Sequence, residues 1–479
     1  MTVRDSLAAE LRRAVRGTAS AAGAALDGAA SDFGGIVRRR PAAVVRPADA
    51  GDVERVLRVA RARGVPVTTR AAGHSVCGQS LSDGGIVLAM RAMGRVLAFG
   101  ADREGAWCEA EPGALWRDVA AAALARGLVP PVLTDYLYTT VGGTHSVGGL
   151  GTASFRHGAQ ADNCVGLEAV TARGERVRCS RRDRPELFAH LLCGLGQLGV
   201  ITRLRIRLRP RGARVRTHLL AYARRDRMMA DLRAATAPAG DAWPADHVGG
   251  WGVDAGGRWM YLLALTAEGH TPAAAAARAD AALAPLRPDR VARTEDRAFA
   301  DFALRGGAPD EHAAAAADAA HPWVDAVMPP AAADAYLGEM RRTLPRALLA
   351  ASTVLCWPLR RRALTRPLFA LPAAPPDDSD GGDFLVLASI MPTVARADLP
   401  RAATLMRRAG ERAVELGGKR YLYGWMEPRR TSWRTHFGAA AWETLCRLKR
   451  EHDPDGLLNP GFIAYDFMAR DAVAAAGHG

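Results

Sequence analysis

The first half of the chain alternates between strand-like and helix-like patterns of apolar residues. A short apolar run at 43–45 predicts a strand, and Asp52 is a suitable N-terminal cap for the helix that follows. The apolar positions of that helix recur at helical spacing: Val53, Val56, Leu57 and Ala60. Gly64 predicts its end, and residues 65–69 form a second strand-like run. This order predicts an α+β domain that reaches Pro210.

The segments on either side of this domain have a different character. Residues 1–35 are rich in alanine and glycine, and we expect an N-terminal extension in which one helix, Ser6–Arg16, precedes a flexible stretch. Beyond 210, strand-like runs are separated by alanine-rich helical segments, and residues 372–383 predict a surface loop. The pattern therefore predicts two α+β domains, over 36–210 and 211–430.

Composition and charge narrow the possible functions. The chain has 479 residues, of which 49% are hydrophobic, enough for two or three domains with ordinary cores. A formal net charge of +14 would suit contact with the phosphates of a nucleic acid. The positive residues are almost all scattered arginines, however, and no nucleic-acid recognition motif accompanies them. We expect no nucleic-acid partner.

Cysteine usage and the N-terminal sequence bear on location. Seven cysteines at irregular spacing, without a Cys-x-x-Cys pair, predict neither a disulfide framework nor a zinc site. His145 and His157 lack a thiolate or carboxylate partner at ligand spacing, so we expect no metal. Residues 1–17 carry charges where a signal peptide has an apolar core, and no apolar run is long enough to span a bilayer. We expect a cytoplasmic protein without a membrane segment.

One glycine motif suggests a function that its context contradicts. Residues 194–199, GLGQLG, match the dinucleotide-binding pattern G-x-G-x-x-G. That pattern requires a strand before the glycines and a helix after them. Here residues 185–192 predict a helix and residues 200–208 predict a strand, so the order is reversed. We do not expect a Rossmann nicotinamide site.

Two other segments carry the clearest chemical signals. Residues 70–80, RAAGHSVCGQS, place His74 in a turn of small residues directly after a strand-like run. Residues 135–158, DYLYTTVGGTHSVGGLGTASFRHG, join Asp135 to a glycine-rich run. Glycine lets backbone N–H groups approach a pyrophosphate, and a nearby carboxylate can act as a base. Together the two segments predict a flavin site.

The combination of motifs resembles the FAD-linked oxidoreductases of the vanillyl-alcohol-oxidase (PCMH) type, to which the berberine-bridge-like enzymes belong, and most closely the cytokinin dehydrogenases. The matching motifs extend from about Pro41 to Gly461 and include 134–146, 155–158, 199–202, 321–323, 357–359, 433–438 and 458–461. The resemblance implies an α+β, two-domain PCMH-type FAD-binding fold with an α+β substrate cap. It also implies that residues 431–479 return to the FAD domain.

The resemblance assigns roles to individual residues. His74 matches the histidine that bonds covalently to the flavin, and Asp135 matches the aspartate that takes a proton from the substrate N–H. Because Cys108 and Cys164 lie far from the position of the cysteinyl link found in some relatives, we expect a single covalent link. The alternatives are a turn histidine and a turn aspartate that bind only backbone groups. Besides Asp135, the positions that match cofactor contacts are Ala71, Ala72, Gly73, Ser75, Gln79, Thr140, Gly143, Ser146, Leu150, Ile201, Tyr421 and Asn459.

Two departures from the family pattern affect these expectations. Ala71 replaces a glycine, and its methyl group would crowd the cofactor if the backbone there had a positive φ. Gly249 aligns with the glutamate that holds the substrate adenine, and loss of that charge-assisted hydrogen bond removes about 1.5–3 kcal/mol. Adenine-type cytokinins are therefore not the expected substrates. An aromatic pocket for another substrate would be lined by Trp251, Trp357, Tyr423 and Trp425, although such residues are as often core.

These observations lead to one main hypothesis and two alternatives. The main hypothesis is an FAD-dependent oxidoreductase that oxidises a C–N bond of a small-molecule amine by hydride transfer to covalently bound FAD. The first alternative keeps the flavin and changes the substrate to an alcohol, a sugar or an aromatic intermediate of secondary metabolism. The second is a flavin-binding or nucleic-acid-binding protein without catalysis. Either oxygen or a quinone would reoxidise the flavin, and the sequence leaves that choice open.

Overall fold

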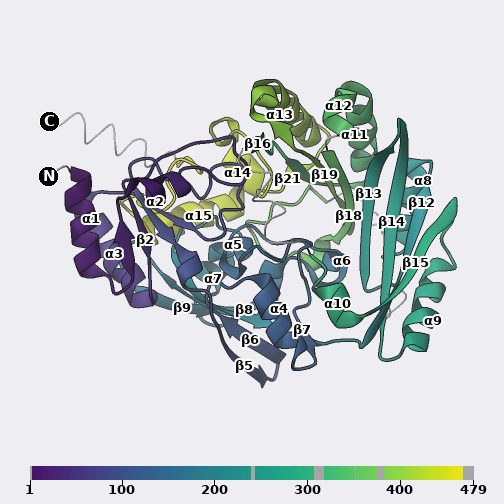
Figure 1. Ribbon diagram of the computed structural model, residues 1–479, viewed down its shortest axis with the longest axis horizontal. Coiled ribbons are helices and arrows are strands. Elements are labelled where there is room, and N and C mark those ends of the chain that lie inside the picture. Colours follow the sequence, from purple (N-terminus) through teal and green to yellow (C-terminus); the bar gives the residue numbers. More distant parts are fainter. Residues whose placement is uncertain are drawn as a thin grey trace.

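The structure is a computed structural model in which two sheet-based bodies lie side by side (Figure 1). The residues that it describes are 3–238, 243–306, 318–350, 352–374, 382–465 and 467. In the first body two smaller sheets carry the N-terminal half of the chain, and in the second one large sheet carries most of the C-terminal half. The α+β fold class predicted from the sequence is confirmed.

The first sheet contains the early strands of the chain. Its order is β1 (Thr18–Ser20), β2 (Ala43–Arg46), β4 (Ile86–Ala89) and β3 (Val67–Arg70). Strand β4 pairs in parallel with β2 and β3, which requires crossover connections, and helix α3 (Ala50–Arg63) is one of them. Gly64 ends α3 in the left-handed conformation, as predicted. The N-terminal cap is Asp49 and not Asp52, which lies inside the first turn.

The second sheet is antiparallel and forms the centre of the first body. Its order is β5 (Val96–Asp102), β6 (Gly105–Ala110), β10 (Val200–Arg207), β8 (Cys164–Val170) and β9 (Arg176–Ser180). A two-stranded ladder, β7 (Leu128–Val129) with β11 (Arg209–Pro210), lies beside it. The helices of this region are α4 (Trp116–Leu124), α5 (Val141–His145), α6 (Ser154–His157) and α7 (Pro185–Leu191). Because α7 precedes residues 194–199 and β10 follows them, the reversed order that we predicted for this glycine motif is confirmed.

The large sheet forms the cap. Its order is β15 (Arg290–Ala298), β12 (Arg214–Tyr222), β14 (Arg258–Gly269), β13 (His247–Ala255), β18 (Ser352–Arg360), β19 (Phe384–Pro392), β17 (Val324–Met328) and β21 (Lys419–Arg420). The helices of this half are α8 (Arg225–Ala234), α9 (Pro272–Leu283), α10 (Phe299–Ala303), α11 (Pro330–Thr343), α12 (Arg346–Ala350) and α13 (Leu399–Glu415). A short ladder joins β16 (Ala319–Ala320) and β20 (Val394–Ala395). Figure 1 shows the strands β12–β15 standing at the far end of the molecule from the N-terminus.

The C-terminal segment returns to the first body. Helices α14 (Trp433–Phe437) and α15 (Ala439–His452) lie among the N-terminal elements in Figure 1. The amide of Val67 donates to the carbonyl of Leu457, and the amide of Asn459 donates to the carbonyl of Val67, so residues 457–459 extend the first sheet. The cap sheet ends with β21, and the return therefore begins before the boundary predicted at residue 430.

The N-terminal segment is not the flexible extension that we expected. Helix α1 (Val3–Ala14) begins and ends earlier than the predicted helix and contacts α3, and β1 pairs with β2. Helix α2 (Gly23–Gly28) follows and contacts β2. The expectation failed because the buried residues Leu7 and Leu11 are separated by polar and small residues, so that composition hides their common face. Residues 3–35 belong to the first body.

A buried carboxylate fastens this segment. Asp52 is fully buried, and its oxygens accept hydrogen bonds from the backbone amides of Arg16, Gly17 and Ala48. Desolvation alone would raise the pKa of Asp52, but these bonds and the ion pair with Arg55 hold the pKa below its ordinary value of 3.8. The charged form of Asp52 therefore stabilises the fold.

All seven cysteines are free thiols, and six of them are buried. None of the helices in the described part of the chain combines the length and the hydropathy that a bilayer span requires.

Replacement of Asp52 by alanine is expected to lower the free energy of unfolding by about 3 kcal/mol, because several hydrogen bonds to a charged group are lost. Folding lowers the pKa of this carboxyl, so its contribution is present above pH 3.8 and is lost as the pH falls through the lower folded value. Urea titration of both proteins at neutral and acidic pH measures the difference.

The matched control is Asp455→Ala, which removes an exposed ion pair with Arg61. It is expected to change stability by less than about 1 kcal/mol. Equal losses for the two variants would contradict the structural role of Asp52.

Candidate active site

One cleft in the first body is built by loops that lie far apart in the sequence. Residues 69–80 run from the end of β3 into the turn after it, residues 139–147 surround α5, and residues 195–201 lead into the first residues of β10. The lining is completed by Met90 and Pro112 and, from the returning C-terminal segment, by Tyr423 and Asn459. No aspartate or glutamate is among the described residues that line this cleft.

The lining suits a diphosphate. Gly142, Gly143, Gly196 and Gly199 line it and expose backbone groups, and the described part of the lining contains no carboxylate. Thr140 caps α5, since its hydroxyl accepts a hydrogen bond from the amide of Gly143 at 3.3 Å. The cleft therefore fits the phosphate-bearing cofactor predicted from the sequence.

In the turn that contains His74, the residue with a positive φ is a glycine, Gly73. Gly73 has φ +71°, and a Cβ there would lie 2.5 Å from the Arg70 guanidinium. Ala71 is not among the described residues with positive φ. The methyl group that replaces the glycine of the family is thus tolerated, and the crowding considered above does not arise.

His74 lies in the cleft between aromatic side chains. Its Nδ1 atom is 3.0 Å from the hydroxyl of Tyr423, and its ring stacks on Phe33 with centroids 4.2 Å apart. The ring of Tyr136, next to Asp135 in the chain, has its centroid 4.8 Å from that of His74. The imidazole is therefore held by three segments of the chain.

The N-terminal segment supports this turn, a contribution that the sequence analysis missed. The hydroxyl of Ser75 donates to Asp32 at 2.9 Å, and the amide of Gly78 donates to the same carboxylate at 2.8 Å. Burial raises the pKa of Asp32 to about 6, although these hydrogen bonds act to lower it. Asp32 lies in an alanine-rich segment, and nothing in the sequence around it indicates that it contacts the turn formed by residues 70–80.

The glycine motif at 194–199 also contributes, although it is not a Rossmann fingerprint. Cys193, Leu195 and Asn459 are non-glycine residues with positive φ, at 57°, 52° and 42°. The amide group of Asn459 donates to the carbonyl of Leu195 and accepts from the amide of Thr69. Such strain is common where a structure holds a ligand, and here it borders the cleft.

The structure brings most of the predicted cofactor residues together. Those that line the cleft are Ala71, Ala72, Gly73, His74, Ser75, Gln79, Thr140, Gly143, Ser146, Ile201 and Asn459. Leu150 and Tyr421 do not line it. Leu150 is buried in the main core, and Tyr421 accepts a hydrogen bond from the amide of Gly149 and so supports the glycine loop from behind.

The four predicted pocket aromatics separate into two groups. Tyr423 lines the cofactor cleft and Trp251 lines a second cavity. Trp357 and Trp425 are 5% and 7% exposed and belong to the main hydrophobic core. The prediction of a pocket role for these two is not supported, because they pack among core side chains.

The two histidines considered as metal ligands have separate surroundings. Burial lowers the pKa of His145 to about 4, and its Nδ1 is 2.8 Å from the carbonyl of Val141 in its own helix. Burial and then the charges of Arg209 and Arg156 lower the pKa of His157 to about 3. In the described ranges no three potential ligand side chains converge on one point.

Asp135 lines the second cavity, which lies between the two bodies and has a volume of about 370 Å³. Its side chain is 47% exposed, but this surface faces the cavity, and protein atoms surround the carboxylate. Desolvation therefore raises its pKa, while Arg305, 3.8 Å away, and His247 act to lower it. A carboxyl group with a raised pKa is suited to act as a base.

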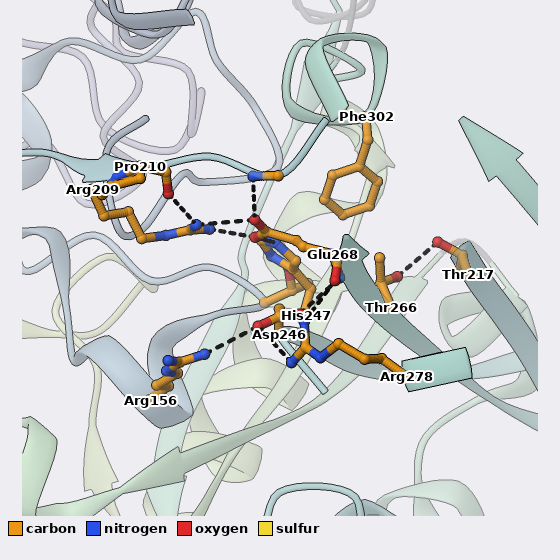
Figure 2. A network of polar contacts seen from close by, with 12 residues as sticks. Arg156, Arg209, Pro210, Thr217, Asp246, His247, Thr266, Glu268, Arg278 and Phe302 are labelled. Atoms are coloured by element: carbon orange, nitrogen blue, oxygen red, sulfur yellow. Dashed lines mark hydrogen bonds and ion pairs between the residues drawn. The ribbon is translucent and has the colours of Figure 1, made fainter. Parts of the chain in front are cut away.

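The cap sheet supplies the opposite wall of this cavity. Strand β13 contributes His247, Gly249 and Trp251, which share one face of the strand because side chains alternate. Figure 2 shows His247 held by Glu268, with their side chains 3.0 Å apart, and beside the ring of Phe302. A Cβ added at Gly249 would lie 3.0 Å from Trp251, which occupies part of the space that a side chain there would need.

Comparison with known proteins matches both bodies. Residues 41–180 match the family model described as FAD binding domain, and residues 254–464 match the model described as Cytokinin dehydrogenase 1, FAD and cytokinin binding. An uncharacterized oxidoreductase of the fasciation locus of Rhodococcoides fascians is 33% identical, covering 91% of this chain and 96% of the relative. Cytokinin dehydrogenase 1 of Oryza sativa subsp. japonica is 32% identical, covering 90% and 88%.

The chain belongs to the cytokinin dehydrogenase family. It is an FAD-dependent oxidoreductase. The residues that line the cofactor cleft would hold the diphosphate and the flavin ring of FAD.

Solved structures share the fold at lower identity. The 6-hydroxy-D-nicotine oxidase of Arthrobacter nicotinovorans has a TM-score of 0.70 and 20% identity, covering 92% of this chain and 96% of that chain. A carbohydrate oxidase of Microdochium nivale has a TM-score of 0.74 and 16% identity, covering 95% and 98%. The family fold extends over nearly the whole chain.

Replacement of Gly73 by alanine is expected to lower the FAD content of the purified protein severalfold, because alanine is strained at this φ and its Cβ meets Arg70. The control is Ala71→Gly, which restores the glycine of the family and is expected to leave the FAD content unchanged. Flavin absorbance per mole of protein measures both. Full FAD content in Gly73→Ala would refute the proposed constraint.

Proposed function

We propose that this protein oxidises a C–N bond of an amine, with Asp135 as the base and His74 as the single covalent attachment point of FAD. The observation that carries the proposal is the arrangement of these two residues. Asp135 lines the cavity between the bodies, while its neighbour Tyr136 contacts the ring of His74 in the FAD cleft. A substrate in the cavity would thus contact the base, and residues 135–136 connect that base with the FAD cleft.

FAD supplies, when bound, an acceptor for the hydride that leaves the substrate carbon. Asp135 takes the proton of the adjacent N–H, so the amine loses two electrons and two hydrogens and becomes an imine. Water then converts the imine into an aldehyde or ketone and a smaller amine. Asp135 must be ionised to act, and Arg305 favours the ionised form against the effect of burial.

The environment of His74 supports its role as the tether. Its ring is held between Phe33 and Tyr136, and the contact with Tyr423 fixes one ring nitrogen. A fixed imidazole in the cofactor cleft is positioned for bond formation, because little rotational freedom remains to be lost.

At Gly249 the cavity lacks the carboxylate that, in the family pattern, holds the substrate adenine. This residue lines the cavity wall opposite Asp135, so the glutamate expected there from the family is absent from the wall itself. The same observation keeps oxidation of an alcohol as a second candidate, in which Asp135 would take the hydroxyl proton. An aldehyde or ketone formed together with a smaller amine distinguishes amine oxidation from this alternative.

The covalent link predicts that flavin stays with the protein after acid precipitation. We expect the wild-type pellet to remain yellow and the supernatant to be colourless. In His74→Ala, any flavin present is expected to move to the supernatant. Replacement of His157, which does not line the cleft, is the control and should leave the pellet yellow. Flavin released from the wild type would refute the covalent link.

Replacement of Asp135 by asparagine is expected to slow flavin reduction by an amine about a hundredfold or more, because the substrate proton loses its acceptor. The FAD content should be unchanged, since Asp135 is not among the residues that line the cofactor cleft. Anaerobic stopped-flow absorbance measures the rate. The control is Asp296→Asn, which breaks an exposed pair with Arg216 in the cap.

The pH dependence gives a second readout of the same base. Because the pKa of Asp135 is raised, the rate of flavin reduction is expected to fall with decreasing pH at values above 3.8. Arg305→Gln removes a cation that lowers this pKa, so the acid limb should move to higher pH. An acid limb that stays in place would exclude Asp135 as the titrating group.

A further inference from the structure

The cavity at Asp135 is walled by one face of the cap sheet at its β15 edge. In the register of the sheet, Glu295 lies opposite Thr217 of β12, and Thr217 lies opposite Thr266 of β14. Arg293 and Arg297 lie two positions before and after Glu295, so they share its face of β15. All of these side chains line the cavity.

The middle of this wall is open because its residues are small. Arg293 lies opposite Leu219, Leu219 opposite Ala264, and Ala264 opposite Gly249. Gly249 and Ala264 present little side-chain bulk between Trp251 and the arginines, although the Trp251 ring takes up part of the space at Gly249. The cavity therefore extends from Asp135 along the sheet to a charged edge.

Positive charge exceeds negative charge in the lining. The lining contains the three guanidinium groups of Arg293, Arg297 and Arg305 and the two carboxylates of Asp135 and Glu295. Arg305 pairs with Asp135 at 3.8 Å, and Arg297 pairs with Glu295 at 2.5 Å. Arg293 is 3.5 Å from the same glutamate, which its neighbour already engages. One cationic group is thus left in excess.

The acidic residues behind the wall do not offset this excess. Figure 2 shows Glu268 bonded to both Arg209 and His247, and desolvation would raise the pKa of Glu268 but these two partners hold it well below its usual range. Asp246 is likewise bonded to both Arg156 and Arg278. Each carboxylate is already shared by two partners, at least one of them an arginine.

Charges on an edge strand often serve only to prevent pairing with another sheet. Arg290, at the start of β15, is exposed, does not line the cavity and suits that role. Arg293 and Arg297 differ, because both line a cavity that also contains the proposed catalytic base. Their position indicates recognition of part of the substrate.

We propose that the cavity takes amines that carry an oxyanion, either a carboxylate or a phosphate, at the end remote from the reacting C–N bond, and that Arg293 and Arg297 bind this group. The assignment rests on the proposed amine oxidation for the orientation of the substrate. Guanidinium groups bind such oxyanions through paired, charge-assisted hydrogen bonds. The anion would also replace part of the interaction that a residue at Gly249 cannot make.

The test compares binding of matched neutral and anionic probes to the flavin-loaded protein. One pair is isopentenyladenosine and its 5′-monophosphate, and the other is benzylamine and 4-(aminomethyl)benzoate. Dissociation constants come from calorimetry on wild type, on the double variant Arg293→Gln and Arg297→Gln, and on Arg290→Gln. Arg293→Gln alone, at a side chain that is 65% exposed, covers the case in which the double variant fails to fold.

The anionic member of at least one pair is expected to bind about tenfold or more tightly than its neutral partner. That preference should fall to about twofold in the double variant, fall partly in Arg293→Gln, persist in Arg290→Gln and weaken with added salt. The pair that responds identifies phosphate or carboxylate. Equal binding of both members in each pair, or a preference that the double variant keeps, overturns the anion site.

Flavin reduction by the same probes separates this proposal from the proposed function. Reduction without a preference for the anion refutes only the anion site. Flavin that stays oxidised with every probe counts against the proposed oxidation of amines, while the binding constants still decide whether the arginines hold an anion.

Discussion

The active site depends on the hydrogen bonds between residues 457–459 and strand β3 of the first sheet. The backbone of residues 457–459 pairs with Val67, and the side chain of Asn459 connects Thr69 with Leu195. Three loops of the FAD cleft are thereby held at one crossing point. The positive φ of Asn459 and Leu195 indicates that the surrounding contacts over-determine this geometry. Buried Lys449 reinforces it, because its ammonium group is bonded to Asp453 and to the carbonyls of Gln197 and Leu458.

Much of the FAD cleft could be predicted from the sequence because glycine and small hydroxyl residues cluster where backbone must approach a cofactor. Residues 71–79 and 140–146 carry that signal, and the structure places most of them around one cleft. Asp32 and Phe33 could not be found in the same way, since their contacts with the His74 turn arise only from tertiary packing. For the tryptophans, the sequence predicted more pocket residues than the structure contains among its described residues. Trp251 and Trp357 have the same chemistry, yet only Trp251 lines a cavity, because strand register and neighbouring small residues decide which ring is buried.

The net charge of the protein says little about its ligands until the positions of the charged residues in the structure are known. A net charge of +14 in the sequence suggests many partners, but in the structure many arginines pair with carboxylates of the same chain. What matters for recognition is therefore the local surplus on the wall of a cavity and not the total. The wall of the Asp135 cavity has such a surplus, whereas no carboxylate is among the described residues that line the FAD cleft, which relies on backbone groups.

The position of His74 between Phe33, Tyr136 and Tyr423 has a consequence for the biogenesis of the protein. During translation, the ribosome releases residue 423 long after residue 74, and Asn459 later still. The nascent chain therefore carries an incomplete flavin pocket until residue 459 has been synthesised. A ribosome-bound chain that ends before residue 459 lacks a complete cleft. A complete cleft thus requires segments spread from residue 69 to residue 459 to be in place together.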